Sequence, residues 1–197
     1  MIIGIDIGIA SPCGVTFVEA DTGQAIRSAE IEQPYKKATT DEKVIIMAVS
    51  VVDHIKDTLR ELQARVALIG LEYAPFMQNR KTYADMSRLA GCLIGMLHSE
   101  GYPFIKVTVG EGRAAMGMGL RGTTKDQVIR FINASTMLCL ADDQEHAADS
   151  CGVAFATLGK YRQQLQQMEV LKQTGAIPPS PLKRQRPARP QRAKYSR

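Results

Sequence analysis

Residues 2–7 spell Ile-Ile-Gly-Ile-Asp-Ile, an apolar run interrupted by a single acid, and this stretch decides the fold. Two more runs of strand-like composition follow closely, at 14–20 (GVTFVEA) and 25–33 (AIRSAEIEQ). Turn-forming residues separate the three runs, at 8–12 and 21–23. Strands joined by such short connections pair with their sequence neighbours, so an antiparallel meander is predicted at the start of the chain.

Helices and strands alternate over the rest of the chain. Apolar residues between Thr40 and Gln63 recur at i, i+3 and i+4, which predicts an amphipathic helix. The apolar run VALIGL at 66–71 is typical of a buried central strand. The other predicted elements are a helix at 82–100, a strand at 104–109, an irregular glycine-rich segment at 110–122, a helix opened by Thr123 with Asp126 in its capping box, and a helix at 143–172. This order predicts an α/β fold, with a mixed five-stranded sheet flanked by helices.

The positive charge of the chain is concentrated at one end. The formal net charge is +5, from 25 basic and 20 acidic residues, but seven of the basic residues and none of the acids lie from Pro178 onward. Residues 1–177 therefore hold 18 basic and 20 acidic residues, so this part is not a generally basic DNA-binding globule. Segment 174–197 is rich in Pro, Arg, Lys and Gln, which predicts a basic disordered tail after one domain at 1–173.

The composition favours a cytosolic protein with no membrane partner. No apolar run reaches the roughly 18 residues that span a bilayer, and the first residues lack the basic region and cleavage site of a signal peptide. The four cysteines, Cys13, Cys92, Cys139 and Cys151, form no C-x-x-C pair of the kind that holds zinc. Three of them lie in apolar, helix-like stretches, where we expect small buried side chains in a reducing compartment.

Acidic residues stand at unusual places in this pattern. Asp6 lies inside the first apolar strand, and Glu72 directly follows VALIGL. In the last helix, His146 and Asp149 are three residues apart and share one face. Hard divalent ions prefer carboxylate oxygens, and two such ions catalyse phosphodiester hydrolysis, so these residues predict a metal-dependent active site.

Each of these residues also has an ordinary explanation when it is taken singly. Asp6 could form a strand-end turn, Glu72 could be a solvated strand terminus, and His146 could be structural. The remaining acids at the start of the last helix, Asp142, Asp143 and Glu145, are interpreted as favourable charge at a helix N-terminus. The order and element placement of the first group together favour the metal site.

In these residues the sequence resembles the RuvC-type Holliday junction resolvases of the RNase H-like superfamily. The matching segments are Gly4–Gly8, Gly70–Glu72 and Glu145–Ser150, within a resemblance that covers about residues 1–160. The family pattern is an Asp, a Glu, then Asp or His followed three residues later by Asp. Asp6, Glu72, His146 and Asp149 match it in order and in element.

The resemblance implies an enzyme that resolves four-way DNA junctions by paired symmetric nicks. It implies two Mg²⁺ or Mn²⁺ ions held by the four matching residues, and a homodimer whose two-fold symmetry suits the junction. Gly117-x-Gly119 followed by Lys125-Asp126-Gln127-Val128 resembles a second family block, in which Lys125 has a catalytic role at the scissile phosphate. Arg113 resembles an arginine of phage-type relatives.

Contacts with branched DNA are expected from aromatic and basic side chains. Phe76 resembles the aromatic that opens the junction in this family, shifted by one residue, and Tyr73 is a competing candidate. The candidate phosphate contacts are Arg80, Lys81, Arg113, Arg121, Lys125 and Arg130, together with the basic tail.

Three other hypotheses compete with a resolvase. Gly-Ile-Asp-Ile-Gly also resembles the first phosphate loop of actin- and Hsp70-like ATPases, but that fold needs well over 300 residues and a second loop, which the sequence lacks. A non-catalytic nucleic-acid-binding module would not need all four metal-site residues. Another RNase H-like nuclease, acting on RNA–DNA hybrids or other branched DNA, would share them.

Overall fold

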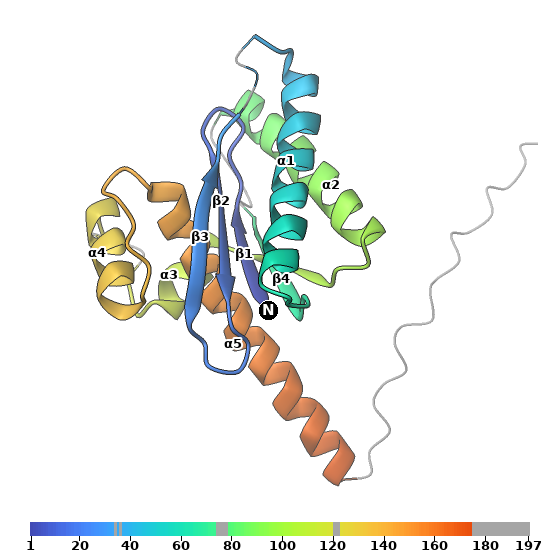
Figure 1. Ribbon diagram of the computed structural model, residues 1–197, viewed down its shortest axis with the longest axis vertical. Helices are drawn as coiled ribbons and strands as arrows, with labels where there is room; N and C mark the ends of the chain where they lie inside the picture. The colour runs from blue at the N-terminus through green and yellow to red at the C-terminus, as the bar shows by residue number, and fades with distance from the viewer. Residues whose placement is uncertain (34, 36, 74–78, 120–122, 175–197) are drawn as a thin grey trace, which may run out of the picture. The chain divides into compact units, whose positions relative to one another are not determined.

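The computed structural model describes residues 1–33, 35, 37–73, 79–119 and 123–174. Its centre is a five-stranded sheet in the order β3-β2-β1-β4-β5, with helices on both faces (Figure 1). The strands are β1 (Ile2–Asp6), β2 (Cys13–Val18), β3 (Ala25–Ile31), β4 (Leu68–Glu72) and β5 (Phe104–Val107). The helices are α1 (Thr40–Glu61), α2 (Arg80–Ser99), α3 (Val109–Ala115), α4 (Lys125–Ser135) and α5 (Glu145–Gln173). The predicted α/β fold with a mixed five-stranded sheet is confirmed.

The strand that carries the first acid, β1, lies at the centre of the sheet. It pairs antiparallel with β2 and parallel with β4, so that Ile5 stands between Val15 and Leu71. β3 continues the antiparallel side, and β5 continues the parallel side. The predicted meander is therefore confirmed, and the C-terminal ends of β1 and β4 lie next to each other at one edge of the sheet.

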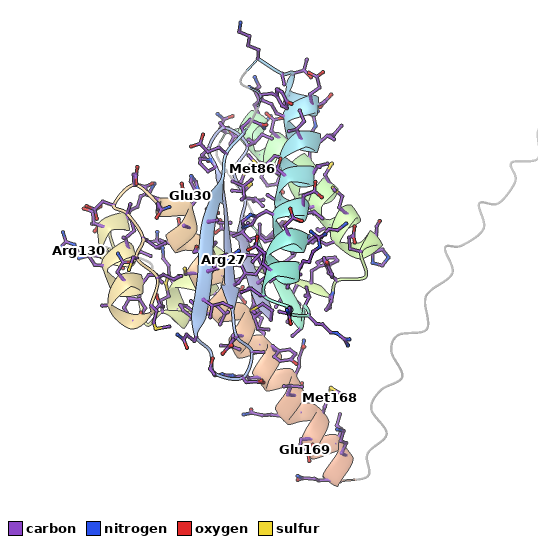
Figure 2. All side chains as sticks on the ribbon, in the orientation of Figure 1. Arg27, Glu30, Met86, Arg130, Met168 and Glu169 are labelled. Atoms are coloured by element: carbon purple, nitrogen blue, oxygen red, sulfur yellow. The ribbon has the colours of Figure 1, made fainter. Side chains whose placement is uncertain are left out.

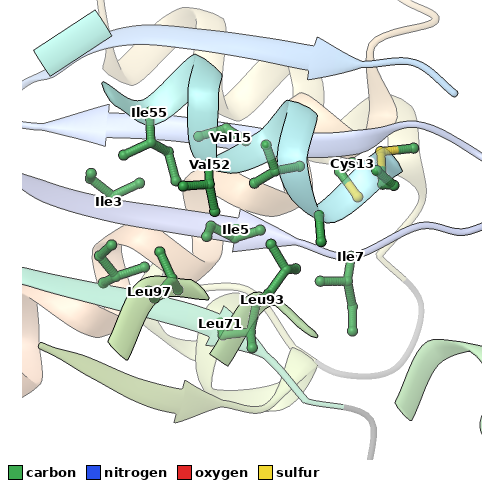
Figure 3. Packing of buried hydrophobic residues seen from close by; sticks show 14 of the residues in the cluster. Ile3, Ile5, Ile7, Cys13, Val15, Val52, Ile55, Leu71, Leu93 and Leu97 are labelled. Atoms are coloured by element: carbon green, nitrogen blue, oxygen red, sulfur yellow. The ribbon is translucent and has the colours of Figure 1, made fainter. Parts of the chain in front are cut away.

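One face of the sheet, termed the α1/α2 face, packs large apolar side chains against α1 and α2. The side chains drawn in Figure 3 include Ile3, Ile5, Val15, Leu71, Val52, Ile55, Leu93 and Leu97, and all of them are at most 2% exposed. Burying one such side chain contributes about 1.5–3 kcal/mol. This cluster is therefore a principal source of the stability of the domain.

The opposite face, termed the α5 face, is covered by the first half of α5 at much closer range. A Cβ atom on Gly4 would collide with the backbone of Ser150 and Ala154, and one on Gly14 would collide with the carbonyl group of His146. Only glycine fits at these two strand positions. The first turn of α5 therefore lies directly on Gly14 near the start of β2, and the following turns lie on Gly4 in the middle of β1.

Two local predictions are wrong. The segment 110–122 is helical in its first half, because Thr108 and Glu111 form a capping box that starts α3. This box offsets the low helix propensity of the glycines in that helix. The capping box of α4 is made by Thr124 and Gln127, one residue after the predicted pair Thr123 and Asp126. The other predicted element bounds agree with the observed ones to within two residues.

The cysteines follow the expectation only in part. All four are free thiols; Cys13 and Cys151 are buried, and Cys92 is half-buried. Cys139 is exposed, because it lies in the connection between α4 and α5 and not in a packed helix.

The chain divides into a compact unit at Met1–Tyr161 and a second unit at Arg162–Arg197. The described part of the second unit is the end of α5, whose side chains are mostly exposed. Most of the segment predicted as a basic tail, from residue 175 on, lies outside the described residues. Over the part of the chain that the structure describes, no helix has the length and apolar character needed to cross a membrane.

Candidate active site

Two of the predicted acids meet at the ends of neighbouring parallel strands. Ile5 pairs with Leu71, so the next residue of each strand, Asp6 and Glu72, stand side by side. The Asp6 side chain is only 8% exposed, and Glu72 shares a hydrogen bond with it. The structure thus holds two carboxyl groups in contact at the edge of the sheet.

The start of α5 adds the other two predicted residues. The Nδ1 atom of His146 lies 2.7 Å from Oδ2 of Asp6. This hydrogen bond is the main reason why the pKa of His146 is raised above its ordinary value. Asp149 follows on the same face of the helix and is half-buried. All four residues of the predicted constellation therefore converge from three separate elements.

Burial and the closeness of the acidic groups shift the pKa values of two residues in the cluster. Burial, followed by the charges of Asp6 and Asp149, raises the pKa of Glu72 to about 8. Burial and the charge of Asp6 also raise the pKa of Asp149. At neutral pH, Glu72 therefore favours its protonated form and can donate its proton to the hydrogen bond with Asp6. A cation among these groups would reverse that preference.

A basic side chain approaches the cluster from α3. Arg113 is half-buried, and its charge lowers the pKa of both Glu72 and Asp149. It is placed by close packing of α3 on α5, since a Cβ atom on Gly152 would lie 3.2 Å from the carbonyl oxygen of Gly112. The helix that the sequence did not predict is thus the one that brings Arg113 to the acids.

The predicted catalytic lysine lies at the rim of the cluster. Lys125 begins α4 and forms an ion pair with Glu145, the first residue of α5. The hydrogen bond with Glu145 is the main cause that raises the pKa of Lys125, and the charges of Asp149 and Asp6 add to it. Glu145, interpreted from the sequence as helix-start charge, is therefore also the partner of Lys125.

A residue that sequence analysis missed holds the start of α5. Oε1 of Glu30, on β3, accepts hydrogen bonds from the backbone N–H groups of His146 and Ala147, at 2.9 and 3.1 Å. Nearby hydroxyl groups bind the same turn: Ser28 Oγ donates to the carbonyl oxygen of Ala147, and Thr16 Oγ1 lies 2.6 Å from Ser150 Oγ. No sequence pattern indicates such contacts, because their partners are more than 100 residues apart.

The competing aromatic candidate, Tyr73, lies just past the acids and is half-buried. Its hydroxyl shares a hydrogen bond with Tyr83, and the Nζ atom of Lys106 lies 4.6 Å from the centre of its ring. These side chains line a cavity of about 280 Å³ with Glu72 and Met86. Tyr73 is thus engaged by neighbours on α2 and β5. The other candidate, Phe76, lies outside the described residues.

The remaining predicted DNA contacts are spread over the surface. Arg80 and Lys81 are exposed in the first turn of α2, which Asn79 caps. Arg130 is exposed on the outer side of α4 (Figure 2). Arg121 lies outside the described residues. Of the six basic candidates, the structure therefore brings Arg113 and Lys125 to the acids and leaves the others it describes at the surface.

The ligand atoms that these side chains offer are of the types that bind a hard divalent cation. Three carboxylates and one imidazole suit Mg²⁺ or Mn²⁺, and a cation would offset the crowding that favours protonated Glu72. Among the residues that the structure describes, no three His, Cys, Asp or Glu side chains surround a single metal position. Asp6 instead forms one hydrogen bond with His146 and another with Glu72.

The fold is that of known Holliday junction resolvases. The structure of T. thermophilus RuvC in complex with Holliday junction substrate matches with a TM-score of 0.61 and 14% identity, over 83% of this chain and 94% of that one. Another Thermus thermophilus RuvC structure gives a TM-score of 0.59 and 16% identity, over 83% and 95%. The yeast mitochondrial Holliday junction resolvase Ydc2 gives 0.57 and 13% identity, over 87% and 83%.

These similarities extend over nearly the whole of both chains but are low in sequence. At 13–16% identity they establish the RuvC-type, RNase H-like fold. No protein-family model matches the sequence, and no curated protein matches it by sequence. Support for the chemistry therefore lies in the side chains of this chain.

Proposed function

We propose that this protein is a metal-dependent nuclease that cuts four-way DNA junctions by paired nicks. The observation that carries the proposal is the convergence of Asp6, Glu72, His146 and Asp149 at the ends of β1 and β4, on the fold of the junction resolvases. The raised pKa of Glu72 supports it further, because perturbed acids cluster at functional sites.

Asp6, Glu72, His146 and Asp149 would hold two Mg²⁺ or Mn²⁺ ions. When bound, these ions supply Lewis acidity to the phosphate and activate water as the nucleophile. Asp6 orients the imidazole of His146 through their hydrogen bond. Arg113 and Lys125, at the inner and outer sides of the cluster, offset negative charge that develops on the phosphate.

DNA contacts would come from basic and aromatic side chains outside the cluster. Arg80, Lys81 and Arg130 are exposed and can contact phosphates away from the cut. Arg121 and the basic tail are proposed as further phosphate contacts, and Phe76 or Tyr73 as the aromatic that opens the junction. A four-way junction has near two-fold symmetry. A homodimer with two such sites would therefore place one site at each of two symmetric strands.

The first test is Mg²⁺-dependent cleavage of a synthetic mobile four-way junction. We expect cleavage by the wild type, and a loss of at least about 100-fold for Asp6→Asn, since replacing even an outer-shell partner of a metal ligand costs 10–100-fold. Junction binding should be retained, because Asn preserves the shape of the side chain. Asp143→Asn, an exposed acid before α5, is the matched control and should cleave at the wild-type rate.

A panel of substrates separates the competing functions. Preference for an RNA–DNA hybrid or a flap would identify another nuclease of the superfamily. Binding without cleavage in Mg²⁺ and Mn²⁺ would identify a non-catalytic module. A fully active Asp6→Asn protein would refute the metal assignment.

A further inference from the structure

Four residues form one row across the sheet at its functional edge. Asp6 pairs with Gly14 on β2, and Gly14 pairs with Glu30 on β3. Glu72 extends the row on β4, as the residue after the Ile5–Leu71 pair. Residues in register on neighbouring strands point to the same face. Across the sheet the row therefore runs in the order Glu72, Asp6, Gly14 and Glu30. All four residues are on the face that is covered by α5.

The first turn of α5 rests on the glycine, between Asp6 and Glu30. A Cβ atom on Gly14 would collide with the carbonyl group of His146. On one side of that contact, Asp6 bonds the His146 ring at 2.7 Å. On the other side, Glu30 accepts the His146 and Ala147 N–H groups at 2.9 and 3.1 Å. His146 is thus held at its ring and at its backbone by two different strands.

The role of Glu30 is that of a helix cap supplied from another part of the chain. A helix leaves its first N–H groups without helical partners, and a side chain at the N-cap position usually bonds the second or third of them. In α5 the second and third residues are His146 and Ala147, and both donate to Glu30. The carboxylate is also favoured there by the helix dipole.

We propose that Glu30, shown on β3 in Figure 2, is a positioning residue of the active site, which fixes the start of α5 so that the His146 ring stays over Asp6. This inference rests on the proposed function for its catalytic meaning. Glu30 acts through the backbone of α5, and it does not ligate the ion.

The chemical difference between a cap and a ligand provides the test. A Gln side chain keeps an oxygen at the same distance and can accept both N–H groups, but it is a poor ligand for Mg²⁺ or Mn²⁺. An Asp side chain keeps the charge but is one methylene shorter, so it cannot reach both groups in the same backbone. A cap predicts that Gln substitutes better than Asp, and a metal ligand predicts the reverse.

The experiment compares Glu30→Ala, Glu30→Gln and Glu30→Asp in the full chain. Glu32→Ala is the matched control, because Glu32 lies two residues along the chain, is exposed and follows the end of β3. The readouts are the dissociation constant for Mn²⁺ and the amide hydrogen exchange of His146 and Ala147. Exchange is measured without metal or DNA.

We expect Glu30→Ala to lose amide protection at both positions and to weaken Mn²⁺ binding by on the order of 10-fold. Glu30→Gln should restore most of both properties, Glu30→Asp less, and Glu32→Ala should equal the wild type. Unchanged amide protection in Glu30→Ala would overturn the proposal, and so would unchanged Mn²⁺ affinity. Tighter Mn²⁺ binding by Glu30→Asp than by Glu30→Gln would overturn it as well. Where the Ala variant fails to fold, the order of Gln and Asp decides.

The same data separate this inference from the proposed function. A wild-type chain that binds Mn²⁺ no more tightly than its Asp6→Asn variant would refute the metal site. The amide exchange of the Glu30 variants would still decide whether this carboxylate holds α5. If Asp6→Asn loses Mn²⁺ and Glu30→Ala does not, the metal site stands and the positioning role fails.

Discussion

The two faces of the sheet differ in the residue types that they present. The α1/α2 face packs large aliphatic side chains such as Ile5, Leu71 and Leu93, each at most 1% exposed, against two amphipathic helices. The α5 face has glycines where those strands present isoleucine and leucine on the other side, and it carries the acids. The first face supplies stability through buried area, while the second brings a helix backbone close enough for its side chains to meet strand-end carboxylates.

The largest effect on cleavage is expected from Gly4→Ala, which puts a side chain on the α5 face where the strand has none. The added methyl group would collide with the backbone of Ser150 and Ala154, which cannot move without displacing α5. Overpacking of this kind costs 1–3 kcal/mol and occasionally more, so we expect a loss of about 3 kcal/mol in the free energy of unfolding. Junction cleavage should fall with it, because the start of α5 would leave β1. Chemical denaturation and a cleavage assay measure the two.

Gly91→Ala is the control for this substitution. Gly91 lies inside α2, and a Cβ atom there meets nothing within 4 Å. Alanine is the better helix former, so the free energy of unfolding should rise by about 0.5–1 kcal/mol. If Gly4→Ala were as stable as the wild type, α5 would not lie as close to the sheet as the structure places it.

The next effect separates stability from activity on the α1/α2 face. Leu93 is fully buried, and Leu93→Ala should lower the free energy of unfolding by about 2–5 kcal/mol. At a temperature where the variant remains folded, its cleavage rate should stay close to that of the wild type. Asp6, His146 and Asp149 lie on the α5 side of the sheet, and Leu93 is not among the residues that line the cavity at Glu72. Leu165→Ala, at a 47% exposed leucine, should be neutral to within about 0.5 kcal/mol. A folded Leu93→Ala protein that cannot cleave would contradict the division of roles between the two faces.

The same division explains what could be predicted from the sequence. The α1/α2 face follows local rules: apolar residues at helical spacing in α1 and a continuous apolar run in β4 predicted both elements to within two residues. The acids could be found because Asp6 interrupts an apolar strand and Glu72 follows one. His146 and Asp149 could be found because they share one face of a predicted helix, and the order of the four residues along the chain matched a family pattern.

The features that were missed depend on contacts between distant residues. Glu30 is an unremarkable acid in a strand until α5 is placed on it, 116 residues later. α3 was predicted irregular because its glycines conceal a capping box, and one of those glycines is what lets α3 approach α5. Neither the pairing of Lys125 with Glu145 nor the approach of Arg113 has a sequence periodicity. Lys125 and Glu145 lie on different helices, and Arg113 of α3 acts on Glu72 of β4 and Asp149 of α5.

The smallest expected effect concerns His54, a half-buried histidine on α1. His54, on α1, packs against Phe17 with ring centroids 6.0 Å apart. Burial first, and then the charge of Arg27, lowers the pKa of His54, although Asp57 and Glu61 oppose this shift. The folded state thus binds a proton less readily than the unfolded state, whose histidine keeps the ordinary pKa of about 6.5. Stability from neutral His54 is present above that pH and is lost on acidification towards the lower folded-state pKa.

We therefore expect the free energy of unfolding of His54→Gln, measured in EDTA, to rise relative to that of the wild type as the pH falls from about 8 to about 5, because only the wild type loses the contribution of neutral His54. The raised pKa of Glu72 changes stability in the opposite direction, but equally in the wild type and the variant. His98→Gln is the matched control, because His98 is exposed on α2, and it should keep the wild-type pH profile. His146 titrates in both variants, so its contribution cancels in the comparison. Its pKa is shifted in the opposite direction by Asp6 on the α5 face. If the free energy of unfolding depended on pH in the same way in both variants, His54 would be solvated. The packing of α1 against the sheet would then be looser at His54 than the structure shows.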